Sequence, residues 1–435
     1  MTFAYALRMQ KQFFVIGLIQ LFSLYSLSQE IFFNIGEEHQ IFLQNPTEQA
    51  NQLNILSLGL KTQYDFSDQI KADADFNFDY LNYTQNAQPG KWTFNGRQLI
   101  LSFSPSWMEL KVGYSIVSTP GTDLNNLFDV VNPKDYRQPF LSKSIGVPGV
   151  FLSLPADVFT WNMFYIPYNQ KSILPDMTSA WWPRANALPI ANSQGTFYTP
   201  ENITYVLSSE TEINEPFKNN FGFNPKFSFS NFDIQLFYYS GVHTTPQIKP
   251  QFNINITSLD PLIGTIQPPV QINYVWSKAE YYGGGITLSL NDYILKVLAS
   301  KKKNKLVSEE NSVASVVSLE SSLALGSKTL HYFLQANREW KDQSTISELQ
   351  TLLGFYEKSL ALGLMLDLSD YGLLTAGVIY NELNPAILES LGFEYSLTDN
   401  FKAKISYNAI VSNGNLLADA YDKVDNASLS LNYNF

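Results

Sequence analysis

The chain has no cysteine, only three histidines and none of the short motifs that mark catalytic or phosphate-binding sites. The absence of cysteine excludes disulfide bridges and fits an exported protein stabilised by closed strand pairing. His39, His243 and His331 stand far apart in the sequence, and no Gly-rich phosphate loop, zinc-ligand spacing or nucleophile pentapeptide occurs. The sequence therefore predicts that the protein is not an enzyme and that it binds no cofactor and no metal.

Long apolar runs are also missing, with one exception at residues 13–27. Arg8 and Lys11 precede this run, and Ser26 and Ser28 offer a cleavage point after it, which is the layout of a secretory signal peptide. A transmembrane anchor is the alternative, but a helix needs roughly 20 apolar residues to cross a bilayer. We therefore predict a signal peptide over residues 1–28, removed after Sec-type export, and no helical membrane domain.

Basic residues are outnumbered, with 28 Lys and Arg against 39 Asp and Glu. Removing residues 1–28 takes away two basic residues and no acidic ones, which leaves a net charge of −13. Proteins bind nucleic acids chiefly through Lys and Arg contacts with phosphates. A chain this acidic therefore predicts no nucleic-acid partner.

Alternation of apolar and polar residues is what the sequence has in abundance. Residues 70–80 alternate without a break, and residues 427–435 do the same and end on Phe435. Such period-two runs predict strands. Many of them are longer than the 5 or 6 residues common in soluble domains, whereas strands tilted across a membrane need about 9 to 11. Counting the runs gives about sixteen to eighteen candidate strands.

We therefore predict an all-β protein, a transmembrane antiparallel β-barrel of about 16–18 strands. The barrel is expected over residues 53–435, after a periplasmic N-terminal segment over residues 29–52. It would lie in the outer membrane of a Gram-negative bacterium, in contact with lipid and lipopolysaccharide. The barrel-assembly machinery is expected to recognise Phe435. For the last strand alone, an edge strand of a soluble sandwich is the alternative.

The alternation also predicts which side chains face lipid. Polar groups in hydrocarbon cost several kcal/mol each. The side chains expected to face lipid are Ala72, Phe76 and Phe78. Those expected to face the lumen are Asp73, Asp75 and Asn77. When turns are counted back from Phe435, residues 398–400 form a periplasmic turn. The same count puts the short turn at residues 326–328 on the outer side, although short turns usually lie on the periplasmic side.

Three stretches interrupt the strand rhythm, at residues 118–145, 167–221 and 241–275. The second and third are rich in proline, which is expected to prevent continuous strand pairing, and the second also contains Trp181 and Trp182. Long irregular segments in a compact fold are usually functional or disordered. We expect one or more of these loops to fold into or over the lumen, and for the third stretch a mobile outer loop is the alternative.

The first stretch carries a local motif. The run Asp129-Val130-Val131-Asn132-Pro133-Lys134-Asp135 follows a Gly-containing strand and an acidic loop, and a strand ending in Pro167 and a Leu174-Pro175 step come after it. This order, over residues 106–185, resembles Gram-negative outer-membrane barrels of the porin-like and alginate-export-like group. That group often has Trp-Gly where this chain has Pro120-Gly121. From the residues alone, Asn-Pro and the flanking acids serve equally well as turn and helix-cap chemistry.

The resemblance implies a barrel whose inward-folded loop gates or narrows a passage for small or hydrophobic solutes or for an exported polymer. Charges of both signs in this region are the candidate pore constriction: Asp123, Asp129, Lys134, Asp135, Arg137 and Arg184. A salt-bridged plug or a solvated loop is the alternative for each of them. The lysines between residues 301 and 305 are interpreted as a solvated strand end, with lipopolysaccharide phosphates as another possible partner.

The sequence therefore favours a porin-like channel for passive or export passage. A hydrophobic-compound transporter resembling the fatty-acid barrels and a structural or surface-binding barrel with a closed lumen are the alternatives.

Overall fold

The structure is a computed structural model. It describes residues 30–44, 51–83, 90–119, 121–122, 124, 126–139, 142–176, 179–182, 187–189, 195–198, 204–305, 311–342, 357–382, 386–412 and 421–435. The expected signal peptide lies outside the described residues. Within them, no helix has the length and apolarity needed to cross a membrane.

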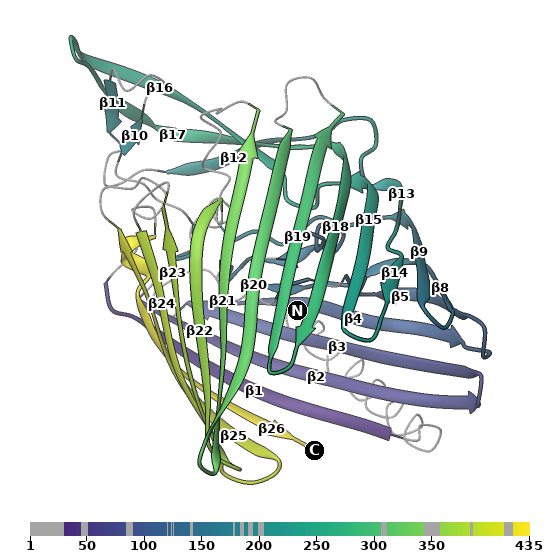
Figure 1. The fold of residues 1–435 in the computed structure, drawn as a ribbon. Helices are drawn as coiled ribbons and strands as arrows, with labels where there is room; N and C mark the ends of the chain where they lie inside the picture. Colours follow the sequence, from purple (N-terminus) through teal and green to yellow (C-terminus); the bar gives the residue numbers. More distant parts are fainter. Residues whose placement is uncertain are drawn as a thin grey trace, which may run out of the picture.

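Most of the described residues form one closed antiparallel barrel (Figure 1). Its strands are β1 (Glu30–Phe42), β2 (Gln52–Ser67), β3 (Ile70–Tyr83), β4 (Lys91–Phe103), β5 (Glu109–Ser115), β8 (Val147–Pro155), β9 (Phe159–Tyr168), β13 (Lys218–Phe223), β14 (Lys226–Ser228), β15 (Phe232–Val242), β18 (Lys278–Leu290), β19 (Tyr293–Asn304), β20 (Ser312–Leu325), β21 (Lys328–Lys341), β22 (Lys358–Ser369), β23 (Gly372–Asn381), β24 (Ala386–Ser396), β25 (Phe401–Ser412) and β26 (Asn426–Asn434). Both β13 and β14 pair with β9 and β15, so they are two parts of one strand. The described chain therefore forms an 18-strand barrel, which confirms the expected fold class.

The first strand closes the barrel. β1 pairs with β2 on one side and with β26 on the other, so that Ile35 lies opposite both Leu58 and Tyr433. The prediction of a periplasmic segment over residues 29–52 is therefore wrong. Gly36 and the two acids after it interrupt the alternation in the sequence, but Ile35 and Ile41 are exposed on the outer face while Gln40 is buried on the inner face.

Short turns gather at one end of the barrel, whereas most connections at the other end are longer. The eight turns that follow β2, β4, β8, β14, β18, β20, β22 and β24 span two to five residues and lie at the end that carries Glu30 and Phe435. Short turns on the periplasmic side are usual for bacterial barrels. The turn at residues 326–327 belongs to this end, so its predicted outer position is wrong. The sequence count missed the outer connection between β23 and β24.

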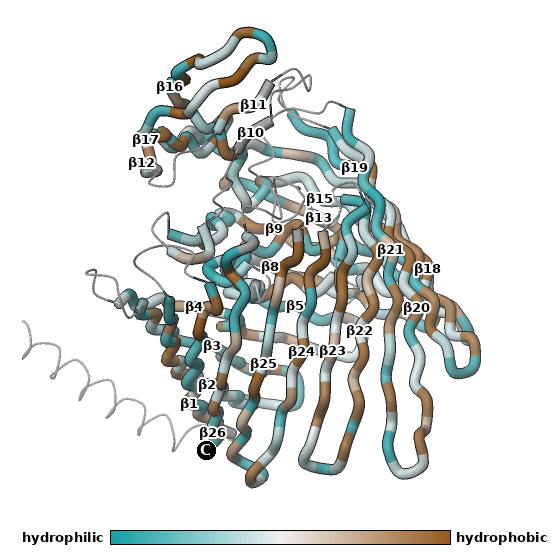
Figure 2. The backbone as a smooth tube through the Cα atoms, turned by 90° about the vertical axis from the view of Figure 1, so that its left-hand side faces the viewer, coloured by the Kyte–Doolittle hydropathy of each residue, from teal (hydrophilic) through white to brown (hydrophobic). Residues whose placement is uncertain are grey.

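Side chains alternate between the two faces of the wall as the sequence predicts. On β3, Phe78 is 41% exposed on the outside, where its ring contacts those of Phe76 and Phe94, and Asp79 is 4% exposed on the inside. By the same alternation Asp73 and Asp75 share the inner face of Asp79. Figure 2 shows hydrophobic residues recurring along the strands that face the viewer, such as β22 to β25.

A second sheet extends beyond the outer rim of the barrel (Figures 1 and 2). It consists of β10 (Ala187–Pro189), β11 (Gly195–Tyr198), β12 (Tyr205–Glu212), β16 (Gln247–Leu259) and β17 (Leu262–Trp276). Proline was expected to prevent continuous strand pairing here, and the segment does form paired strands, but the β16–β17 ladder shifts register twice. Pro268 and Pro269 lie in a bulge, because Gln267 pairs with Asn253 and the next described pair joins Gln271 to Gln251. A bulge leaves residues out of the ladder, so the missing N–H groups of proline break no strand hydrogen bond.

Candidate functional site: a lumen crossed by an inner loop

The connection between β5 and β8, residues 116–146, folds into the lumen, and we call it the inner loop. Its Phe128 is fully buried and stacks on Phe237 of β15 with a distance of 5.0 Å between ring centroids. Gly283 of β18 makes room for this ring, since a Cβ atom at that position would lie 2.4 Å from Cε1 of Phe128. An aromatic knob and a glycine therefore fix one side of the inner loop to the wall formed by β15 and β18.

Charged groups fix the other side of the inner loop to β3 and β4. Arg137 donates from Nε to Asp135 at 2.9 Å and from Nη1 to Thr93 at 2.7 Å, and its Nη2 lies 3.5 Å from Asp79. Asn95 donates to both acids, at 2.5 Å to Asp79 and 3.2 Å to Asp135. The charged side chains are at most 14% exposed. Removing one partner of such a buried pair leaves an uncompensated charge, so this contact holds the loop firmly.

These two anchors lie far apart around the barrel. Starting from β3, the wall passes through β4, β5, β8, β9, the β13–β14 strand and β15 before it reaches β18. Four of the eighteen described strands, β5, β8, β9 and the β13–β14 strand, therefore separate the two anchors. The inner loop crosses the lumen from one wall to another, as expected for a loop folded into the barrel.

The Asn-Pro motif organises the interior of the inner loop. Asn132 accepts a hydrogen bond from the backbone N–H of Val117 at 2.8 Å and donates to the carbonyl of Val117 at 2.9 Å and to Asp129 at 2.7 Å. Lys134 forms an ion pair with Asp129 at 3.1 Å. Burial alone lowers the pKa of Lys134, but the neighbouring Asp129 carboxylate outweighs it and raises that pKa, so the lysine stays charged.

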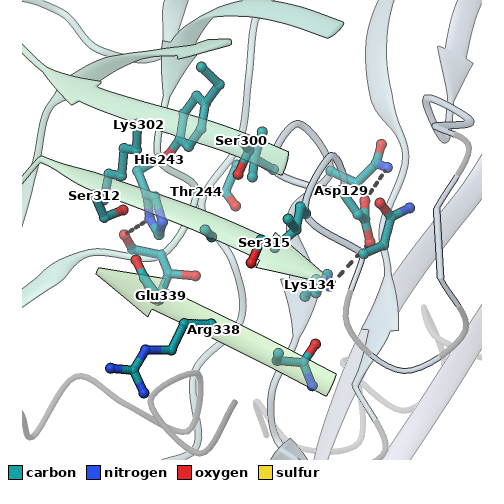
Figure 3. A pocket seen from close by; sticks show the side chains of 18 of the residues that line it. Asp129, Lys134, His243, Thr244, Ser300, Lys302, Ser312, Ser315, Arg338 and Glu339 are labelled. Atoms are coloured by element: carbon teal, nitrogen blue, oxygen red, sulfur yellow. Dashed lines mark hydrogen bonds and ion pairs between the residues drawn. The ribbon is translucent and has the colours of Figure 1, made fainter. Parts of the chain in front are cut away.

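A cavity of about 190 Å³ lies between the inner loop and the wall from β18 to β21 (Figure 3). Most of the residues that line it are polar, among them Asn126, Lys134, His243, Ser300, Lys302 and Ser312. Burial and the nearby Lys302 lower the pKa of His243 to about 3. The imidazole is therefore neutral at physiological pH, and lysine and carboxylate groups carry the charge of the cavity.

Two tryptophans narrow the outer mouth of the lumen. Trp181 packs among inward-facing apolar residues at the outer ends of β1, β2 and β22–β25, and its ring centroid lies 5.7 Å from that of Phe42. Trp182 packs against the second sheet, with its ring centroid 5.8 Å from that of Tyr205. Residues 179–182 therefore link the barrel wall to the outer sheet across the mouth.

Four of the six predicted constriction residues are described, and they form two pairs. Asp129 binds Lys134, and Asp135 binds Arg137. The other two, Asp123 and Arg184, lie outside the described residues. That these charges form the pore constriction and set its ion selectivity is still a prediction.

Sequence reasoning missed several partners of the inner loop. They are Asn95, which donates to Asp135, Asp79, which pairs with Arg137, and Gly283, which receives Phe128. The alternating acids of β3 were a usable signal for Asp79, because they mark an inward charged stripe. Nothing near Gly283 in the sequence points to a loop more than 150 residues earlier. No group of residues able to hold a metal ion occurs within the described part of the chain.

No protein-family model and no curated protein matches this sequence. Among solved structures, Pseudomonas aeruginosa OccK5 (OpdH) is similar with a TM-score of 0.50 at 9% identity, over 93% of this chain and 97% of that one. P. aeruginosa OccK2 (OpdF) has a TM-score of 0.49 at 10% identity, and Salmonella typhi OmpF in complex with daunomycin 0.42 at 10%, each over 93% of this chain and 97% of its own. Identities this low show the fold alone. With an apolar outer face around a closed 18-strand wall, the chain has the porin-type fold of integral proteins of the bacterial outer membrane.

Proposed function

We propose that the protein is a porin-like channel for small polar solutes, and that its inner loop narrows the passage. The observation that carries this proposal is the double anchoring of the inner loop, by Phe128 on β15 and β18 and by Arg137 on β3 and β4. A loop held on two walls reduces the free cross-section of the lumen, and such a narrow point determines which solutes pass.

The chemistry of the inner wall supports polar rather than apolar solutes. Buried polar side chains line it on many strands, including Gln40, Ser102, Gln235, Ser318, Gln335, Asn337, Asn426 and Ser428. Alternation places these residues on the face opposite to the lipid-exposed leucines, valines and aromatics. Amides and hydroxyls exchange hydrogen bonds with water and with polar solutes at little cost, whereas an apolar solute would desolvate them.

An enzymatic function finds little support. His331 stands far from the other histidines in the sequence, but its Nδ1 lies 2.6 Å from the hydroxyl of Ser322 and its Nε2 lies 3.4 Å from Asp367. These groups resemble a nucleophile, a base and an acid. All three project from paired strands, whose backbone N–H groups are used in the sheet and are not free to stabilise an oxyanion. We therefore interpret the contact as cross-strand hydrogen bonding.

Liposome swelling with uncharged sugars of increasing size tests the channel proposal. Wild-type protein is expected to admit small sugars and exclude larger ones. A variant in which a short Gly-Ser linker replaces residues 122–138 is expected to admit larger sugars. Lys226→Gln, at a half-buried position near the periplasmic end of the wall, is the matched folding control. Liposomes that stay impermeable with both wild type and the shortened variant would favour a structural barrel with a closed lumen.

A hydrophobic-compound transporter is the second candidate, because of the apolar cluster around Trp181 at the mouth. A long-chain fatty acid entering that cluster would change the fluorescence of Trp181, and Trp181→Phe would remove the change. Under the channel proposal the fatty acid produces no change that depends on Trp181. Polymer export rests only on the local resemblance around Asp129–Asp135, a segment that here belongs to the loop crossing the lumen.

A further inference from the structure

Positive charge gathers on one part of the outer surface, although the chain as a whole is acidic. Lys301 and Lys303 of β19 are exposed, and they alternate with Ser300 and Lys302, which line the inner cavity. Alternation therefore directs Lys301 and Lys303 away from the lumen. Lys278 of the neighbouring β18 and Lys305, directly after β19, lie close by, and Arg338 lies two strands away on β21. Together they form what we call the outer cation patch: Lys278, Lys301, Lys303, Lys305 and Arg338.

Aromatic side chains place this patch at the level of lipid headgroups. Tyr282 lies opposite Lys301 in the β18–β19 ladder, is 43% exposed, and has its ring centroid 5.2 Å from that of Tyr238. The guanidinium of Arg338 lies 5.7 Å from the ring centroid of Trp340, which is also exposed. Tyr and Trp collect at membrane interfaces. The patch is at the end of the barrel opposite to the short turns, which corresponds to the outer leaflet.

The protein itself neutralises little of this charge. Glu280, opposite Lys303 in the ladder, accepts a hydrogen bond from the Tyr282 hydroxyl at 2.8 Å and lies 3.5 Å from Lys305. Among the described residues Lys301 and Lys303 form no ion pair, although each is exposed. Cations at a membrane surface are stabilised by anionic headgroups.

The surface below the patch suits acyl chains. Val313 of β20 lies opposite Lys301, and on the membrane side of this pair Val297 of β19 lies opposite Val317 of β20; all three valines are 42–43% exposed. An amphipathic ligand with anionic groups above an apolar body matches this order of cations, aromatic rings and valines. Free phosphate ions match only the cations.

We propose that the outer cation patch binds the phosphate groups of lipid A, the membrane anchor of lipopolysaccharide, in the outer leaflet. Lys301 and Lys303 contact the phosphates, and the exposed valines of β19 and β20 contact the acyl chains. The site lies outside the lumen, so it does not depend on the proposed channel function. Its occupation would fix the barrel among lipopolysaccharide molecules.

Equilibrium binding of fluorescent lipid A to the purified barrel in detergent micelles tests the proposal, with EDTA present to remove bridging divalent cations. Each lysine near an anionic surface contributes about fivefold in affinity, so Lys301→Gln with Lys303→Gln should weaken binding by about thirty-fold. The control is Lys402→Gln with Lys404→Gln, which removes the same charge from the inner face near the short turns. The control should bind lipid A as wild type does.

Two further binding measurements distinguish recognition of the lipid A phosphates from recognition of the acyl chains or of free phosphate. Dephosphorylated lipid A should bind wild type no better than it binds the Lys301/Lys303 variant, and inorganic phosphate should not compete with lipid A. Equal lipid A binding by wild type and the Lys301/Lys303 variant, with both shown to be folded by their heat-modifiable migration, would overturn the proposal. So would tight binding of dephosphorylated lipid A, or competition by inorganic phosphate at equal concentration.

Discussion

At the scale of single residues, the inner loop depends on two contacts of opposite chemistry. Arg137 holds Asp135 and Asp79 in a buried charged cluster on β3 and β4, and Phe128 fills the space that Gly283 leaves on β18. Each contact can be removed by one substitution. Because the two anchors lie on separate strands and share no partner, their effects should be nearly additive.

Arg137→Met should both destabilise the protein and widen the channel. The substitution leaves two buried carboxylates without a cation, which typically costs about 3–5 kcal/mol. Urea titration in detergent should therefore show a lower free energy of unfolding, and planar bilayers a higher conductance. Lys143→Met removes a cation from an exposed position of the same loop and should change neither quantity much. If Arg137→Met behaved like Lys143→Met, the charged anchor would have no role.

Gly283→Ala should loosen the aromatic anchor. The added Cβ would lie 2.4 Å from Phe128 and 2.9 Å from the carbonyl oxygen of Ala299, so either the loop or the strand must move. Overpacking of this kind costs about 1–3 kcal/mol. Gly377→Ala on β23 is the matched control, because the nearest atom to its Cβ is 3.9 Å away. Equal thermal unfolding temperatures for the two variants would contradict the packing that we describe.

At the scale of elements, β1 decides whether the barrel closes. It pairs along most of its length with β2 and with β26, so its loss leaves two long unpaired edges. A mature chain that begins at residue 43 should therefore fail to give heat-modifiable folded protein on refolding into detergent. Replacing residues 45–50 by a Gly-Ser linker of equal length is the control, since it keeps every residue of β1 and β2. A folded, heat-modifiable product from the truncated chain would support a periplasmic segment instead.

The same scale shows what can be predicted from sequence and why the rest cannot. Alternation gave the strand faces of β3, because one face meets lipid and the other meets water. It failed for β1, where Gly36, Glu37 and Glu38 interrupt the pattern although the strand pairs on both sides. For β17 the expected effect of proline was too strong. Proline excludes a ladder hydrogen bond only where one is needed, and a bulge removes that need at Pro268.

The inner loop was only partly predictable. Its apolar and charged composition indicated docking inside the barrel, and Asp129, Lys134, Asp135 and Arg137 do belong to its contacts. The partners on the wall depend on strand order and register around a closed barrel, which no local pattern encodes. For this reason the pairing of Phe128 with Gly283 and of Arg137 with Asp79 could be recognised only in the folded chain.

At the scale of the whole molecule, two segments lie across the interior of the barrel. Residues 179–182 lie across the outer mouth between the barrel wall and the second sheet, and the inner loop crosses the lumen between β3–β4 and β15–β18. The surrounding wall is polar inside and apolar outside. This arrangement fits selective passage of small polar solutes through an outer-membrane barrel, and the outer cation patch lies outside that passage.

Single-channel conductance in planar bilayers tests the central claim most directly. Wild-type protein should give small, discrete conductance steps, and the variant with residues 122–138 replaced by a short linker should give clearly larger ones, because the loop no longer crosses the lumen. Both proteins must first show heat-modifiable migration, so that a misfolded barrel is not measured. Equal conductance of the two folded proteins, or no conductance from either, would contradict the account.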